Sequence, residues 1–226
     1  YANAQHAQKA EGKPGDAIIL LGGDNYRIGM GGGAVSSVKG GEYTQTLELD
    51  AVQRANAEMQ KRVFNVIRAL AEIVDNPIVL VHDHGAGGHM NCLTELMEAS
   101  GGVIFLDRLP IGDKTLSARE IICNESQERM GLVVPAQKVP LVQQLAEREK
   151  APCYLVGEIN DSNRIVFKDK DGSCPVDLPI NVLLGSSPTT ILLDQSAPLG
   201  LRPLDFAPKG GEDLLRTLEQ VLSLES

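Results

Sequence analysis

The stretch that says most about the fold is residues 78–92, IVLVHDHGAGGHMNC, because it predicts a strand, a turn and a helix in succession. Its unbroken apolar run at residues 78–81 predicts a buried strand, residues 85–88 form a glycine-rich break, and the apolar period of residues 90–97 predicts a helix. At such a strand, turn and helix, free backbone N–H groups and the helix dipole favour a bound anion. The stretch therefore indicates a phosphate or nucleotide site, with the alternative that the glycines serve only the turn.

Asp83 stands at the end of the predicted strand. A carboxylate there can hold a divalent cation against a phosphate, because Mg²⁺ is usually bound by one or two carboxylates together with phosphate oxygens. The alternative is that it caps the turn. A zinc site also has to be considered, although no zinc-ligand spacing fits the neighbouring residues His82, His84, His89 and Cys92. We expect each histidine to be solvated or hydrogen-bonded and assign it no function.

Composition narrows the class of protein. The 226 residues suffice for one large domain with linkers, and a hydrophobic content of 42% permits a sizeable core. The formal net charge of -9, with no basic run, argues against nucleic acid as a partner. Neither a membrane span nor a signal peptide is recognisable, so we expect a cytoplasmic protein with no membrane partner. Free buried thiols are expected for the four cysteines, which form no C-x-x-C pair: Cys92, Cys123, Cys153 and Cys174.

A second glycine cluster, RIGMGGGAVSS, occupies residues 27–37. Gly29, Gly31 and Ala34 satisfy the G-x-G-x-x-A pattern of dinucleotide folds, but the segment that follows lacks the apolar period of a helix. We favour a flexible loop that approaches a ligand or a neighbouring domain. Its candidates for cofactor contact are Gly31, Gly32 and Gly33.

The remaining periodicity predicts alternating strands and helices on one sheet, which is an α+β or α/β architecture. A long helix begins near Asn56 and ends before residues 76–77, and Ser117-x-x-Glu120 predicts a capping box. A helix is expected at residues 139–148, and the polar run at residues 124–129 is typical of a solvated turn. Further strands are expected at residues 17–21, 103–106, 130–134, 154–159 and 165–168.

Gln53 lies just before the long helix. It is either the third member of a capping box, Asp50-x-x-Gln53, or an amide that hydrogen-bonds a ligand. Its spacing from Asp50 leaves both readings open.

Three regions are expected along the chain. Residues 1–15 read as a linker or cut end, residues 16–194 as the folded subdomain, and residues 195–226 as a linker followed by a helix at residues 213–224. That helix has a leucine-rich face with no predicted partner in the chain. We expect it to belong to the next part of a longer protein, or to make the fragment a homodimer.

Four stretches, taken together and in this order, resemble a known enzyme family. They are GMGGGAVSS, AVQRANAEMQKR, VHDHGAGGHMN with LTELMEASGG, and CNESQERMGLVV. Over most of residues 15–194 the chain resembles the large single-chain phosphoribosylformylglycinamidine synthases of the aminoimidazole-ribonucleotide synthetase superfamily. The resemblance implies an α+β domain of layered sheet and helices, like the C-terminal domain of aminoimidazole-ribonucleotide synthetase. It also implies a fragment of the ATP- and glutamine-dependent ligase that converts formylglycinamide ribonucleotide to formylglycinamidine ribonucleotide in purine biosynthesis.

The same resemblance implies roles for particular residues. Asp83 matches the Mg²⁺ ligand, and the substrate contacts match Gln53, Glu125, Ser126 and Gln127. No catalytic residue is expected in this chain, because most of the ATP site belongs to a missing upstream part and the glutaminase to a missing downstream part. The substrate and these two parts are the expected partners, and the isolated chain should be inactive. The alternative is a non-catalytic phosphate- or nucleotide-binding or scaffold module, which would not need these residues around one cleft.

Overall fold

The computed structural model describes residues 10–30, 35, 38–53, 56–185, 189, 191 and 210–223. The chain forms two compact units, residues 1–186 and residues 187–226. The boundary predicted after residue 194 lies outside the described residues, as do most of the predicted first linker and Gly31, Gly32 and Gly33.

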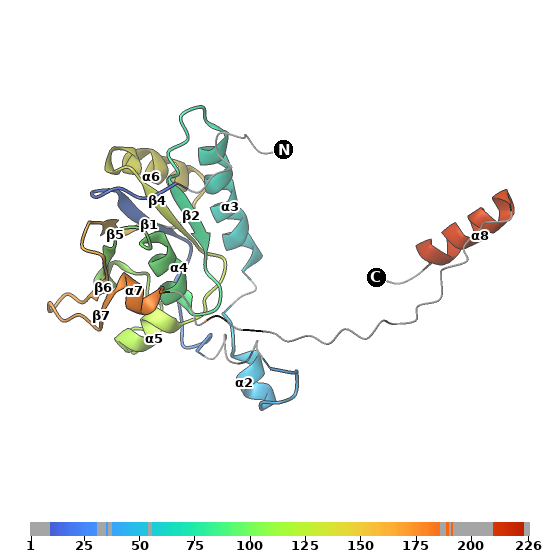
Figure 1. Cartoon of the computed structure of the whole chain (residues 1–226), viewed down its shortest axis with the longest axis horizontal. Helices are drawn as coiled ribbons and strands as arrows, with labels where there is room; N and C mark the ends of the chain where they lie inside the picture. Colours follow the sequence, from blue (N-terminus) through green and yellow to red (C-terminus); the bar gives the residue numbers. More distant parts are fainter. Residues whose placement is uncertain are drawn as a thin grey trace. The chain divides into compact units, whose positions relative to one another are not determined.

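A seven-stranded mixed sheet forms the centre of the first unit (Figure 1). Its strand order is β2-β4-β1-β5-β3-β6-β7, in which β3 and β6 are parallel and the other neighbours are antiparallel. The predicted α+β class is confirmed. The strands are β1 Ala17–Leu21, β2 Leu80–Asp83, β3 Gly102–Phe105, β4 Met130–Val134, β5 Cys153–Ile159, β6 Arg164–Lys168 and β7 Val176–Pro179.

Helices cover both faces of this sheet. Figure 1 shows α3 and α6 on one side and α4 and α5 on the other. In β1, Ile19 and Leu21 join the core under α3 and α6, whereas Ile18 and Leu20 join the opposite core. The strand is wholly apolar because both of its faces are buried. The helices are α2 Gln45–Leu49, α3 Ala57–Glu72, α4 Gly88–Leu96, α5 Ala118–Cys123, α6 Val139–Arg148 and α7 Ile180–Leu183, with short 3₁₀ turns at Leu106–Arg108 and Ala136–Lys138.

Local capping signals are confirmed where the sequence shows them. The side chain of Asn56 caps α3 by accepting from the backbone N–H of Met59 at 3.0 Å. Ser117 and Glu120 form the reciprocal capping box of α5. The capping box at Asp50 and Gln53 is wrong, because Asp50 ends α2, a short helix that the sequence did not predict.

The cysteines only partly follow expectation. All four are free thiols, and Cys92 is buried, but Cys123 and Cys174 are exposed. Cys123 ends the short helix α5 and Cys174 lies in the turn before β7, so neither faces a core. Burial raises the pKa of Cys153 to about 11 and that of Cys92 further, which keeps both thiols protonated and unreactive.

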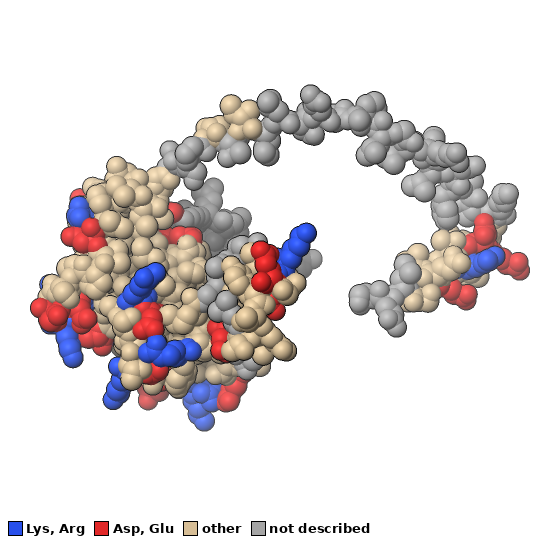
Figure 2. All heavy atoms as spheres, turned by 90° about the horizontal axis from the view of Figure 1, so that it is seen from below, with Lys and Arg blue, Asp and Glu red and all other residues tan. Residues whose placement is uncertain are grey.

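The described part of the second unit contains α8, Gly211–Leu222 (Figure 1). This helix begins two residues before the predicted start. Its apolar residues are exposed: Leu214, Leu215, Leu218, Val221 and Leu222. None of the described helices is long and apolar enough to cross a membrane. On the face of the first unit that Figure 2 presents, acidic and basic side chains are intermingled.

Candidate functional site

Three segments that are distant in sequence are joined by backbone hydrogen bonds. The N–H of Gly29 donates to Asp50 O and the N–H of Glu125 donates to Gly29 O, both at 2.8 Å. The N–H of Gln53 donates to Glu125 O and that of Gln127 donates to Gln53 O, both at 2.9 Å. Gly29 has φ +86, and a Cβ there would lie 2.3 Å from Glu125 O. Glycine is therefore required where the loop crosses residue 125.

The glycine turn of the first quoted stretch packs against the same region. Asp83 pairs with Met130 in the β2–β4 ladder, and the N–H of His84 donates to Arg129 O at 3.2 Å. Gly88, at the start of α4, has φ +58, and a Cβ there would lie 2.1 Å from Asn124 O. The turn after β2 and the segment before β4 are thus in direct backbone contact. The synthetase interpretation requires this, because it needs Asp83 and residues 125–127 around one cleft.

Gln53 uses its side chain to hold the loop that follows β1. Its Oε1 accepts from the backbone N–H of Tyr26 and its Nε2 donates to Asp24 O, both at 2.8 Å. One lone pair of Oε1 and one hydrogen of Nε2 are left for a ligand. Gln53 is therefore a structural residue of the site whatever else it contacts.

Residues 124–129 are not a solvated turn. Glu125 and Ser126 are buried, because the segment packs between Gln53 and the glycine turn. Nε2 of Gln127 donates to Oε1 of Glu125 at 3.0 Å. Glu125 therefore positions Gln127 rather than facing open space.

Two cavities adjoin at residues 127–129. Cavity 1, of about 350 Å³, lies between α3 and the end of β2, and its polar wall contains Asp83, His84 and residues 127–129. Cavity 2, of about 360 Å³, has a wall that contains Gln53, Ser126 and the same residues 127–129. The structure thus brings together four of the five residues implied by the resemblance, with Glu125 immediately behind Gln127.

The Asp83 carboxylate fits one kind of metal and not another. Its side chain is 76% exposed at the mouth of cavity 1. Within the described ranges, no group of three or more His, Cys, Asp or Glu residues is placed to hold a metal ion. A zinc site made by protein ligands alone does not fit this geometry, since it needs three or four such ligands. Mg²⁺ fits, because it keeps waters and takes ligand phosphate oxygens beside one carboxylate.

A buried hydrogen-bonded chain runs behind Asp83. Nη1 of Arg129 lies 3.3 Å from Nε2 of His89, and Nδ1 of His89 lies 2.9 Å from Nε2 of His84. A guanidinium only donates, so His89 accepts at Nε2, donates from Nδ1, and leaves His84 protonated at Nδ1. Burial, aided by the Arg129 charge, lowers the pKa of His84 to about 3. Burial and then His84 lower the pKa of His89 well below 6.5. Both imidazoles are neutral at pH 7.

Buried polar atoms without partners are concentrated here. In the part of the chain that the structure describes, seven buried side-chain nitrogen and oxygen atoms lack a hydrogen-bond partner. Native structures leave few such atoms, and each needs a reason, such as a ligand or an ordered water. All seven belong to residues of this region: Asn25, His84, Asn124, Glu125, Ser126 and Arg129.

Sequence reasoning missed the residues that complete the site. The sequence assigns no function to His84 or His89, and it marks Arg129 only as the end of a polar run. A charge beside a strand is ordinarily solvated, so its burial has no local signal. The glycines at residues 85–88 are the one indication that the turn approaches another backbone closely.

Comparisons with known proteins show which family the chain resembles. The family model described as AIR synthase related protein, C-terminal domain, matches residues 13–170. Phosphoribosylformylglycinamidine synthase of Dictyostelium discoideum is 39% identical over 199 residues, which cover 86% of this chain and 15% of that protein. The Homo sapiens enzyme of the same name is 38% identical over 240 residues, which cover 98% of this chain and 18% of that protein. The chain therefore spans less than a fifth of the length of these relatives.

Among solved structures, Thermotoga maritima PurL complexed with FGAR matches with a TM-score of 0.73 at 24% identity. The match covers 87% of this chain and 32% of that one, and shows that the two share a fold. Because the family model spans more than half of the chain, including every segment of the site, this chain belongs to the family of AIR synthase related proteins and carries their C-terminal domain.

Proposed function

We propose that this chain is the part of a phosphoribosylformylglycinamidine synthase that binds substrate and magnesium. The whole enzyme would be the ATP- and glutamine-dependent ligase of purine biosynthesis that makes formylglycinamidine ribonucleotide. The relatives that carry this name support the proposal. The observation that carries it is the convergence of Gln53, Ser126, Gln127 and Asp83 on two cavities that share residues 127–129.

Gln127 has the central place in this proposal. Its side chain borders both cavities and is oriented by Glu125. An amide that offers both a donor and an acceptor suits a ribonucleotide that carries an amide and hydroxyl groups. Ser126, whose buried Oγ has no partner, offers a second donor in cavity 2.

Asp83 would hold the Mg²⁺ ion at the open side of cavity 1. When bound, that ion supplies positive charge that stabilises a transferring phosphoryl group. Solved structures of T. maritima PurL are complexed with ATP, ADP and AMPPCP, which supports nucleotide use. We propose that most ATP contacts and the glutaminase come from other parts of the longer enzyme, in the cytoplasm.

The test is Asp83→Asn in the full-length enzyme that contains this chain. Removing the carboxylate charge should lower Mg²⁺-dependent turnover by orders of magnitude. Folding should be unaffected, because the side chain is exposed. Asp161→Asn, in the exposed turn between β5 and β6, is the matched control and should retain full activity. Unchanged turnover of Asp83→Asn at limiting Mg²⁺ would refute the magnesium role.

A substitution at Gln127 separates the ligase from a scaffold module. Gln127→Ala should raise KM for formylglycinamide ribonucleotide at least tenfold, a loss of about 1.4 kcal/mol, which is typical of a hydrogen bond to a polar ligand. A scaffold would show no change in any kinetic constant. The unfolding midpoint of the variant, measured in parallel, shows whether the loss is specific to binding.

A further inference from the structure

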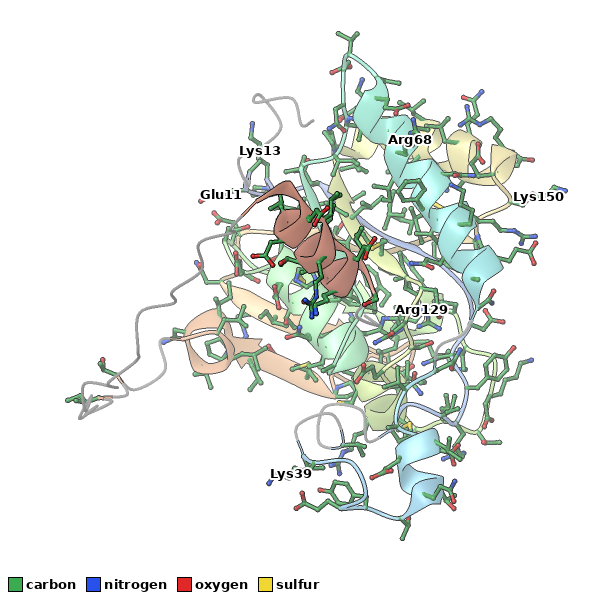
Figure 3. The ribbon with its side chains drawn as sticks, turned by 90° about the vertical axis from the view of Figure 1, so that its right-hand side faces the viewer. Glu11, Lys13, Lys39, Arg68, Arg129 and Lys150 are labelled. Atoms are coloured by element: carbon green, nitrogen blue, oxygen red, sulfur yellow. The ribbon has the colours of Figure 1, made fainter. Side chains whose placement is uncertain are left out.

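The guanidinium of Arg129 is a cation inside the first unit. Its exposed fraction is 3%, and it borders both cavity 1 and cavity 2. Figure 3 shows Arg129 within the body of this unit, whereas Lys39 and Lys150 extend from its periphery. A basic residue is almost never this buried unless a partner compensates its charge.

That compensation is incomplete. Nη1 is bonded to neutral His89, but Nη2 has no partner. None of the ion pairs formed among the described residues includes Arg129. Burial lowers the pKa of Arg129 to about 10, although Asp24 and Glu128 act in the opposite direction. The group remains charged at pH 7 in a place that favours an added anion.

Neighbouring residues hold this cation in a defined orientation. A Cβ at Gly22 would lie 2.6 Å from Cγ of Arg129, so the glycine makes room for the arginine stem. On the far side, the chain through His89 to His84 holds Nη1. One edge of the guanidinium is therefore anchored and the other is left for a ligand.

We propose that Arg129 binds a terminal phosphate group at the junction of cavities 1 and 2, with Nη2 donating to a phosphate oxygen, and that His89 is a positioning residue. The inference rests on the proposed function, in which the ligand is a phosphorylated ribonucleotide. A planar guanidinium matches the oxygens of a phosphate better than an ammonium does. Because Nη2 is shielded from solvent, the atoms that cover it at this junction have to shift when the phosphate enters.

The phosphate has two potential sources, the ribose phosphate of the substrate and the terminal phosphate of a nucleotide. Calorimetric titrations of the 226-residue chain with ribose 5-phosphate, ribose and AMPPCP distinguish them. If the ribose phosphate is the source, ribose 5-phosphate binds, ribose does not, and Arg129→Met weakens binding at least tenfold. If instead AMPPCP binds, ribose 5-phosphate does not, and Arg129→Met weakens the binding of AMPPCP, the site belongs to the nucleotide. Arg68→Met, on the exposed side of α3, is the control and leaves binding unchanged.

Two further measurements keep the test valid if a variant folds poorly. In wild type, the guanidinium ¹⁵N–¹H signals that disappear in Arg129→Lys must shift when the phosphate ester is added. In buffer without phosphate, Arg129→Met should change the unfolding midpoint by no more than a few degrees, because the hydrogen bond lost to His89 is offset by removal of a buried cation whose charge is not compensated. A fall of about 5 °C or more would instead show a structural arginine.

The inference is overturned if wild type binds neither ribose 5-phosphate nor AMPPCP, if the guanidinium signals do not move, or if Arg129→Met binds as wild type does. If Arg129→Met retains binding while Gln127→Ala loses it, only the role of Arg129 fails. The proposed function is judged separately, by turnover of Asp83→Asn.

Discussion

Acidification should begin to destabilise the first unit near pH 6.5, which is well above the pH range in which carboxylates are protonated. His84 and His89 are buried and neutral, and the pKa of His84 is lowered from 6.5 to about 3. Between these values the unfolded chain binds protons that the folded chain does not. Stability is therefore fully present above pH 6.5 and is lost as the pH falls toward 3.

The size of this effect follows from the linkage relation. At pH 5 the imidazole of His84 is protonated in the unfolded chain but neutral in the folded chain, which costs the folded chain about 2 kcal/mol of stability relative to pH 7. His84 alone should therefore lower the free energy of unfolding by about 2 kcal/mol, and His89, whose pKa is also lowered, acts in the same direction. Carboxylates with lowered pKa values, such as that of Glu120, lose their contribution only below their ordinary value of 4.5.

Urea unfolding followed by circular dichroism at pH 7, 6 and 5 measures this slope. His89→Gln keeps an amide donor and acceptor for its neighbours but does not titrate, so the pH dependence should become weaker. His82→Gln, at a partly exposed histidine paired with Glu95, is the control and should keep most of it. A free energy of unfolding that is constant from pH 7 to pH 5, or a wild-type slope in His89→Gln, would refute the reasoning.

Three further predictions concern the glycine turn, the cap of α5 and self-association through α8. Gly88→Ala should cost about 3 kcal/mol in urea unfolding, because a Cβ would meet Asn124 O at a positive φ. Gly172→Ala, also at positive φ but with nothing within 4 Å, isolates the backbone strain and should cost about 1 kcal/mol. Ser117→Ala should cost about 1 kcal/mol by removing the capping box of α5, and an unchanged midpoint would contradict it. We expect the exposed apolar residues of α8 to make the chain self-associate, so deleting residues from Glu212 onward should leave a monomer by light scattering, and a full chain that is already monomeric would contradict this.

The sequence alone was enough for elements with a strong local signal. The predicted helix at residues 139–148 is α6, and the predicted strand at residues 130–134 is β4. Asn56 caps α3 where the polar residue precedes the apolar period. These features depend on neighbours within about four residues, and the chain carries that information directly. β7 and α7 were missed, because VDLPINVL, residues 176–183, has no unbroken apolar run or clear period and is interrupted by Pro179.

Only the tertiary structure decided how the site is assembled. The pairing of Asp83 with Met130, which are 47 positions apart in the sequence, sets the glycine turn beside Arg129. The same packing buries a polar segment that reads locally as a solvated turn, and it turns Gln53 from a capping candidate into the support of a distant loop. Arg129 looks like any charge at a strand end until β4 is placed in the sheet. Burial and pairing arise from contacts between distant segments, so the chemistry of His84, His89 and Arg129 could not be derived from their own neighbours in the chain.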